Sequence, residues 1–155
     1  MKVLIALLLM AITFLSCGTA GTASDIPKPS EVNFKGEKLP NIQMFPGWKT
    51  TLQFEKDNDS TLTGEYLKIV DAVSEYLRVN TEHNVYLRCF MHENELEKTN
   101  VKRRDFIRKR ISEAGISEKR VLANIEKPMI PQDESDIFTE EELIKARRVD
   151  MQIMK

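Results

Sequence analysis

The chain has 155 residues, of which 41% are hydrophobic and 30% are charged, so it is long enough for one ordinary domain and too short for a large multidomain enzyme. Lys and Arg together number 23 and Asp and Glu 24, so no overall charge excess argues for nucleic acid or for an acidic substrate. Two Cys and two His are too few for a zinc-cluster module or a disulfide-built scaffold, and the fold must therefore depend on its hydrophobic core.

Residues 1–16 have the layout of a signal peptide, because one lysine is followed by about a dozen apolar residues. The stretch ends at Ser16 and Cys17, which resemble the bacterial lipobox, where a small residue precedes a cysteine that receives lipid and becomes the new N-terminus. We expect acyl chains on Cys17 to anchor the mature chain in a membrane. The alternative is a plain secretory signal cut a few residues later. With Cys17 lipidated, Cys89 is the only free thiol of the mature chain, either a small buried residue of a strand or a reactive or intermolecular group.

Residues 17–47 are predicted to form the lipidated N-terminus and a flexible tether. The first half is rich in Gly, Thr and Ala, Pro27 and Pro29 follow, and no sustained apolar period runs through the segment. The more apolar residues 39–48 are expected to pack on the edge of a domain that spans residues 48–155.

The first half of this domain alternates strands and helices. Residues 50–55 alternate apolar and polar side chains, which predicts a half-buried strand, and apolar residues between 62 and 77 recur at helical spacing. A second strand is expected at 84–91. A second helix is expected at 98–114, ended by Gly115 in a left-handed C-cap.

The second half is predicted to contain a third strand at 120–125, an exposed loop at 126–138, a short helix at 139–144 and a final strand at 149–154. The order strand, helix, strand, helix, strand, strand indicates an α/β fold, with both long helices on one face of a sheet.

Three stretches of the sequence carry a resemblance to a known domain: the opening strand and helix at 52–77, the segment 103–116, and the Ala-Arg-Arg-Val start of residues 146–153. They are similar to the OmpA-like C-terminal domain, by which many Gram-negative envelope proteins hold peptidoglycan. Segment 103–116 has an Arg, aliphatic residues four and eight positions later, and a Gly-Ile end. The resemblance covers about residues 49–155 and implies a two-layer sandwich, with a mixed sheet and two main helices on one face.

In that family an Asp after the second strand and an Arg on the second helix hold the amino-acid end of diaminopimelate in the peptidoglycan stem peptide. A carboxylate pairs with the ligand's ammonium, and the guanidinium fork takes its carboxylate. The resemblance places Arg103 at the Arg and His92 at the missing Asp, with Glu93 beside it, and expects Arg147 near the same cleft. The alternatives are a solvated helix charge for Arg103, a loop residue for His92 and a packed surface group for Arg147.

The second predicted helix carries a dense positive charge that Asp105 alone offsets. Such a face is suited to anionic peptidoglycan or lipid, or to an acidic partner such as residues 140–142; a simple solvated face is the alternative. Nucleic acid is not expected, because aromatic residues are not interleaved for base stacking. The cations within residues 98–110 are Lys98, Lys102, Arg103, Arg104, Arg108, Lys109 and Arg110.

Two functions follow as hypotheses. The first is a noncatalytic outer-membrane lipoprotein whose domain faces the periplasm, contacts peptidoglycan and links the membrane to the cell wall. Gly18 favours the outer membrane, because it is not the Asp that retains many lipoproteins in the inner membrane. The second is a lipoprotein subunit of a multiprotein envelope assembly, such as a type VI secretion system, with the diaminopimelate clamp lost; the missing Asp and the short loop 93–99 favour it.

An enzyme is not expected. The sequence has no Ser-His-Asp arrangement, no Gly-rich phosphate loop and no His or Cys set at metal-ligand spacing, so no cofactor and no metal site are predicted.

Overall fold

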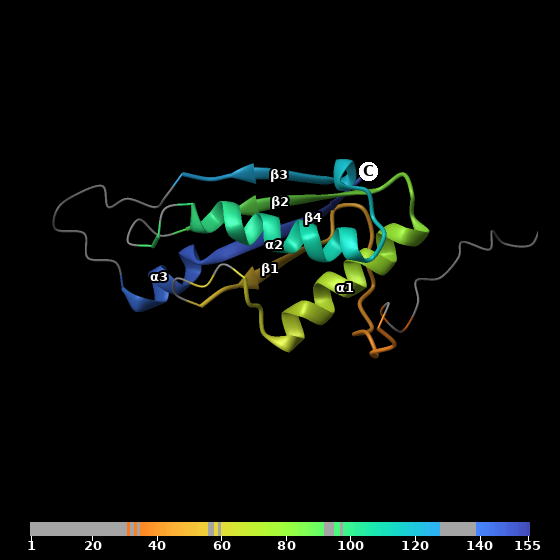
Figure 1. Ribbon diagram of the computed structural model, residues 1–155, viewed down its shortest axis with the longest axis horizontal. Helices are drawn as coiled ribbons and strands as arrows, with labels where there is room; N and C mark the ends of the chain where they lie inside the picture. The colour runs from red at the N-terminus through yellow and green to blue at the C-terminus, as the bar shows by residue number, and fades with distance from the viewer. Residues whose placement is uncertain are drawn as a thin grey trace, which may run out of the picture.

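The computed structural model in Figure 1 describes residues 31, 33, 35–55, 58, 60–91, 95, 96, 98–127 and 139–155. The predicted signal peptide and Cys17 lie outside this part of the chain. No helix within the described residues is long and apolar enough to cross a membrane. The elements in chain order are β1 (Lys49–Gln53), α1 (Gly64–Val79), β2 (Asn84–Cys89), α2 (Thr99–Glu113), the short 3-10 helix η1 (Glu118–Arg120), β3 (Val121–Ile125), α3 (Glu140–Ala146) and β4 (Arg148–Met154).

The four strands form one mixed sheet in the order β1-β4-β2-β3. β2 and β3 are parallel and are joined through α2, whereas β4 lies between β1 and β2 and is antiparallel to both. Leu52 of β1 is opposite Val149, and Leu87 of β2 is opposite Met151, so the apolar positions of neighbouring strands share one face. The predicted mixed sheet is confirmed.

Helices α1 and α2 cover this apolar face, and Figure 1 shows α2 in front of the sheet with α1 beside α2. Val73 and Leu77 of α1 and Ile107 and Ile111 of α2 are fully buried between the two layers. These residues recur every four positions, which places them on one side of each helix. The expected two-layer sandwich is therefore confirmed.

Gly115 ends α2 as predicted. Its φ is 84°, in the left-handed region that glycine adopts without a steric penalty, and its N–H donates to the Ser112 carbonyl at 2.9 Å. Ile116 then turns back into the core, where it is buried. The start of α2 is less ordinary, because Lys98 has a φ of 65° without being glycine.

The segment before β1 contacts the helices. Asn33 and Leu39, in the stretch predicted as a tether, are buried, and the Asn33 amide donates to Asp71 of α1 at 2.7 Å. Met44 and Trp48 are partly buried against the main core, as expected for residues packed at the domain edge.

Candidate functional site

Arg103 lies in the first half of α2, and its side chain points into the protein. It precedes Ile107 and Ile111 by four and eight residues, and these spacings place all three on the helix face that contacts the sheet. The relative exposure of Arg103 is 0%. Arg103 is therefore not a solvated helix charge.

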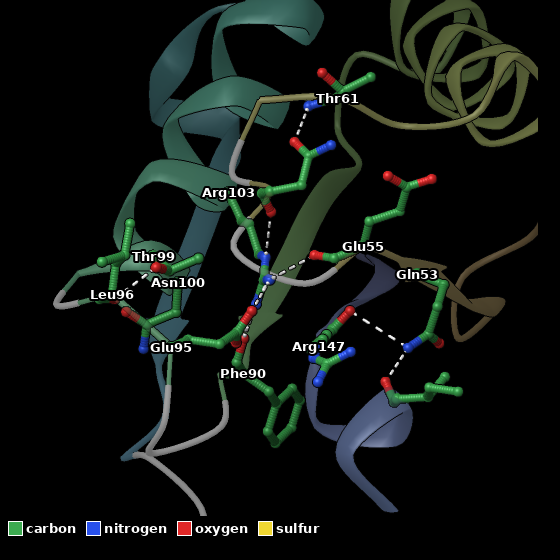
Figure 2. Close-up of polar contacts among 12 residues, drawn as sticks. Gln53, Glu55, Thr61, Phe90, Glu95, Leu96, Thr99, Asn100, Arg103 and Arg147 are labelled. Carbon is green, nitrogen blue, oxygen red and sulfur yellow. Dashed lines mark hydrogen bonds and ion pairs between the residues drawn. The ribbon is translucent and has the colours of Figure 1, made fainter. Parts of the chain in front are cut away.

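The guanidinium of Arg103 uses all five of its N–H donors (Figure 2). Nε donates to the carbonyl of Asn58 at 3.0 Å, and Nη1 donates to the carbonyl of Phe90 at 3.1 Å. Nη2 donates to the carbonyl of Glu55 at 3.4 Å. The two donors that remain hold the Glu95 carboxylate, Nη1 at 2.9 Å from Oε2 and Nη2 in contact with Oε1.

The three carbonyls come from the chain that follows β1 and β2, so Arg103 ties together the connections at one end of the sheet. Its guanidinium carbon also lies 5.1 Å from the centre of the Phe54 ring, which adds a cation–π contact. The Glu95 side chain is only 2% exposed. The pair is a buried, bidentate ion pair, in which each charge depends on the other because water does not solvate either of them.

Glu95 was not among the predicted site residues. The predicted positions His92 and Glu93 lie outside the described residues. The sequence has Glu at 93, 95 and 97 in the connection between β2 and α2, and nothing in their spacing selects the one that meets Arg103. The sequence did indicate that the Arg103 side chain points inward, because Arg103 stands four residues before the apolar Ile107.

Arg147 lies at the same end of the sheet as Arg103 (Figure 2) and is 8% exposed. Its backbone carbonyl accepts hydrogen bonds from the Phe54 N–H at 2.8 Å and from Gln53 Nε2 at 3.4 Å. Through its backbone, Arg147 joins the start of β4 to the end of β1, next to the Phe54 ring that Arg103 contacts.

The predicted cationic face of α2 is divided by the fold. Arg110 points inward like Arg103 and binds Asp71 of α1 through two hydrogen bonds of 2.7 and 2.8 Å. This bidentate contact raises the pKa of Arg110. Lys102 and Lys109 are exposed. The face presented to solvent is therefore less charged than the sequence predicted, because a count of charges does not show which of them turn inward.

Cys89 in β2 is fully buried, and burial raises the pKa of its thiol to about 12, so it is the small core residue and not the reactive thiol. Within the described ranges, no group of three or more His, Cys, Asp or Glu residues is arranged to hold a metal ion.

The described part of the chain thus combines a four-stranded mixed sheet, two helices on one face of it and a buried Arg early in the second helix. Among solved structures, the chain is similar to the peptidoglycan-associated lipoprotein from Burkholderia pseudomallei, with 17% identity and a TM-score of 0.56 over 67% of this chain and 89% of that one. It is also similar to the periplasmic domain of Helicobacter pylori MotB, with 14% identity and a TM-score of 0.53 over 73% of this chain and 79% of that one.

A third similar structure is the OmpA-like domain of FopA1 from Francisella tularensis subsp. tularensis SCHU S4, with 9% identity and a TM-score of 0.50 over 68% of this chain and 71% of that one. No protein-family model matches the chain, and no curated protein matches it. At these identities the similarity establishes the fold alone. The OmpA-like fold that the sequence predicted is thus confirmed.

Proposed function

We propose that this chain is a noncatalytic protein of the cell envelope whose OmpA-like domain contacts peptidoglycan from the periplasmic side. Lipid on Cys17 attaches it to the outer membrane, so that the protein links membrane and wall. The observation that carries the proposal is the fold, which is similar to that of a peptidoglycan-associated lipoprotein at a TM-score of 0.56.

The chemistry of Arg103 supports this function. A guanidinium fork on a rigid helix binds planar carboxylates with two parallel hydrogen bonds, and Arg103 holds Glu95 in this manner. A peptidoglycan stem peptide of the diaminopimelate type carries a carboxylate that the same fork accommodates. His92, Glu93 and Arg147 belong to the proposed surroundings of this ligand.

Sedimentation with purified diaminopimelate-type peptidoglycan tests the proposal. The unlipidated mature chain is expected to sediment with the wall. Arg103→Lys keeps the charge but loses the fork and should release most of the bound protein, whereas Arg88→Lys, a matched change at an exposed position of β2, should not. A folded wild-type chain that stays in the supernatant contradicts the proposal.

The lipid anchor has a separate test. Cells that express the whole chain with radiolabelled palmitate are expected to label the wild type and not Cys17→Ser. Equal labelling of both chains contradicts lipidation at Cys17.

One observation favours a second function, that of a lipoprotein subunit in a multiprotein envelope assembly such as a type VI secretion system. All five donors of Arg103 are used within the protein, so the described structure offers no open carboxylate clamp. This candidate predicts no sedimentation with peptidoglycan and a stable complex with another envelope protein in co-purification.

A further inference from the structure

Glu95 occupies the position in the Arg103 fork that an external carboxylate needs. We propose that this fork is a carboxylate-binding site filled by the chain's own Glu95, and that a ligand carboxylate binds by displacing this side chain. The inference rests on the proposed function for the source of the ligand, a peptidoglycan stem peptide. It adds to that function that Glu95 competes with the ligand carboxylate for Arg103.

The contacts of Arg103 identify Glu95 as its replaceable partner. The carbonyls of Glu55, Asn58 and Phe90 belong to the backbone next to β1 and β2, and they take three of the five donors. The two donors that remain, one on each terminal nitrogen, both hold the Glu95 carboxylate (Figure 2). A free carboxylate has the same planar shape and the same charge, so it fits the same two donors.

The backbone next to Glu95 is held independently of the ion pair. Both the N–H and the hydroxyl of Thr99 donate to the carbonyl of Leu96, at 3.1 and 2.5 Å. The Leu96 side chain is 62% exposed, so the chain reaches the surface one residue after Glu95. Rotation of the Glu95 side chain towards solvent therefore frees the fork without a change in α2.

The exchange keeps charge balanced. Loss of Glu95 without replacement leaves Arg103 as an uncompensated buried charge, which is strongly unfavourable, whereas a ligand carboxylate restores the pair. Because Glu95 is part of the chain, it competes with the ligand carboxylate at a high effective concentration. The observed affinity for the ligand equals the intrinsic affinity multiplied by the fraction of molecules in which the fork is open. Removal of Glu95 should therefore increase affinity for a carboxylate ligand by at least about tenfold.

Chemical rescue tests the inference. Glu95→Ala in the unlipidated mature chain removes a CH₂–COO⁻ group, which acetate replaces atom for atom. We expect a lowered Tm that sodium acetate raises more than sodium chloride of equal ionic strength. We also expect meso-diaminopimelate to bind this variant at least about tenfold more tightly than the wild type in calorimetry. Glu126→Ala is the matched control, because it removes a carboxylate that pairs with exposed Arg88. Acetate should not raise the Tm of this variant more than sodium chloride does, and its affinity for meso-diaminopimelate should equal that of the wild type.

A folded Glu95→Ala variant that acetate does not stabilise and that binds meso-diaminopimelate no better than the wild type overturns the inference. Should Glu95→Ala not fold, Glu95→Gln replaces it, because it keeps the shape of the side chain and removes its charge. Unchanged affinity for meso-diaminopimelate in folded Glu95→Gln overturns the inference equally.

Sedimentation with peptidoglycan separates the inference from the proposed function. Binding of acetate and meso-diaminopimelate by Glu95→Ala, with no sedimentation of either chain, supports the occupied fork and contradicts the wall-binding function. Equal sedimentation of both chains, with no carboxylate binding by the variant, supports wall binding through another surface and overturns the inference.

Discussion

Neither Arg103 nor Glu95 is stable as an isolated buried charge, because at 0% and 2% exposure neither side chain is solvated by water. Arg103→Leu should therefore lower the free energy of unfolding by about 3–5 kcal/mol, since it removes the buried guanidinium that holds the Glu95 carboxylate and donates to three carbonyls. The double variant Arg103→Leu with Glu95→Leu should lose less than the single one. Urea denaturation of the wild type, Arg103→Leu, Glu95→Leu and the double variant measures this, and losses that simply add would show that the two charges are not coupled.

Cys89 should be unreactive in the folded protein. With a thiol pKa of about 12, roughly one molecule in ten thousand carries the reactive thiolate at about pH 8, and the side chain has no exposed surface. Iodoacetamide should therefore label the native chain at least about 100-fold more slowly than the chain in concentrated guanidinium chloride. Similar rates in the two conditions, followed by mass spectrometry, would mean that β2 opens readily.

The site could be predicted from the sequence only in part, for a reason specific to these residues. Arg103 was found because a guanidinium four residues before Ile107 matches a known pattern. Its partner was missed because three Glu residues alternate within a short connection, and their order along the chain does not determine which one turns inward.

At the scale of elements, α1 and α2 are joined by a polar contact as well as by their apolar faces. Asp71 is 1% exposed and accepts two hydrogen bonds from Arg110 and one from Asn33. Asp71→Ala should lower the free energy of unfolding by about 2–3 kcal/mol, and Asn33→Ala by about 1 kcal/mol. Asp105→Ala, which removes an exposed partner of Arg104, is the control and should change stability by less than about 0.5 kcal/mol. Equal losses for the Asp71 and Asp105 variants in thermal denaturation would contradict a structural role for Asp71.

The end of α2 gives a prediction that depends on backbone conformation alone. A Cβ on Gly115 would meet no atom within 4 Å, but its φ of +84° is unfavourable for alanine. Gly115→Ala should therefore destabilise the protein by about 1 kcal/mol. The control is Gly64→Ala at the start of α1, where the space is equally open and φ is not positive, so stability should be unchanged or slightly higher. Identical Tm shifts would show that the conformation of Gly115 is not strained by a side chain.

The elements themselves were well predicted, because their hydrophobic periods are clear. Alternation with period two located β1 and β4, four-residue spacing located α1, and Gly115 located the end of α2. The hydrophobic period did not predict that Arg110 turns towards α1. Its partner Asp71 is 39 residues away in the sequence and belongs to a different helix.

For the whole molecule, β4 is the element on which the sheet depends. It lies between β1 and β2 and is the only strand paired with β1 in the described sheet. A chain that ends before Arg148 should therefore show no cooperative unfolding transition by circular dichroism, because β1 then has no partner strand. Removal of Lys155 alone, which is exposed, should leave the transition unchanged. A cooperative transition in the shorter chain would mean that the remaining elements form a stable core without β4.

The contact between Asn33 and Asp71 also determines how mechanical force enters the domain. In the proposed arrangement, with a lipid anchor at Cys17 and the domain held at the wall, tension that enters from the N-terminal side reaches the contact of Asn33 with Asp71 of α1 before it reaches β1. That contact, the buried Leu39 and the partly buried Met44 and Trp48 hold the segment, without the ladder of backbone hydrogen bonds that holds β1 in the sheet. Their rupture frees the chain between Asn33 and Lys49, whose fully extended length is about 50 Å at roughly 3.3 Å per residue. In that arrangement, this segment lengthens as membrane and wall move apart, before force reaches the strands of the sheet.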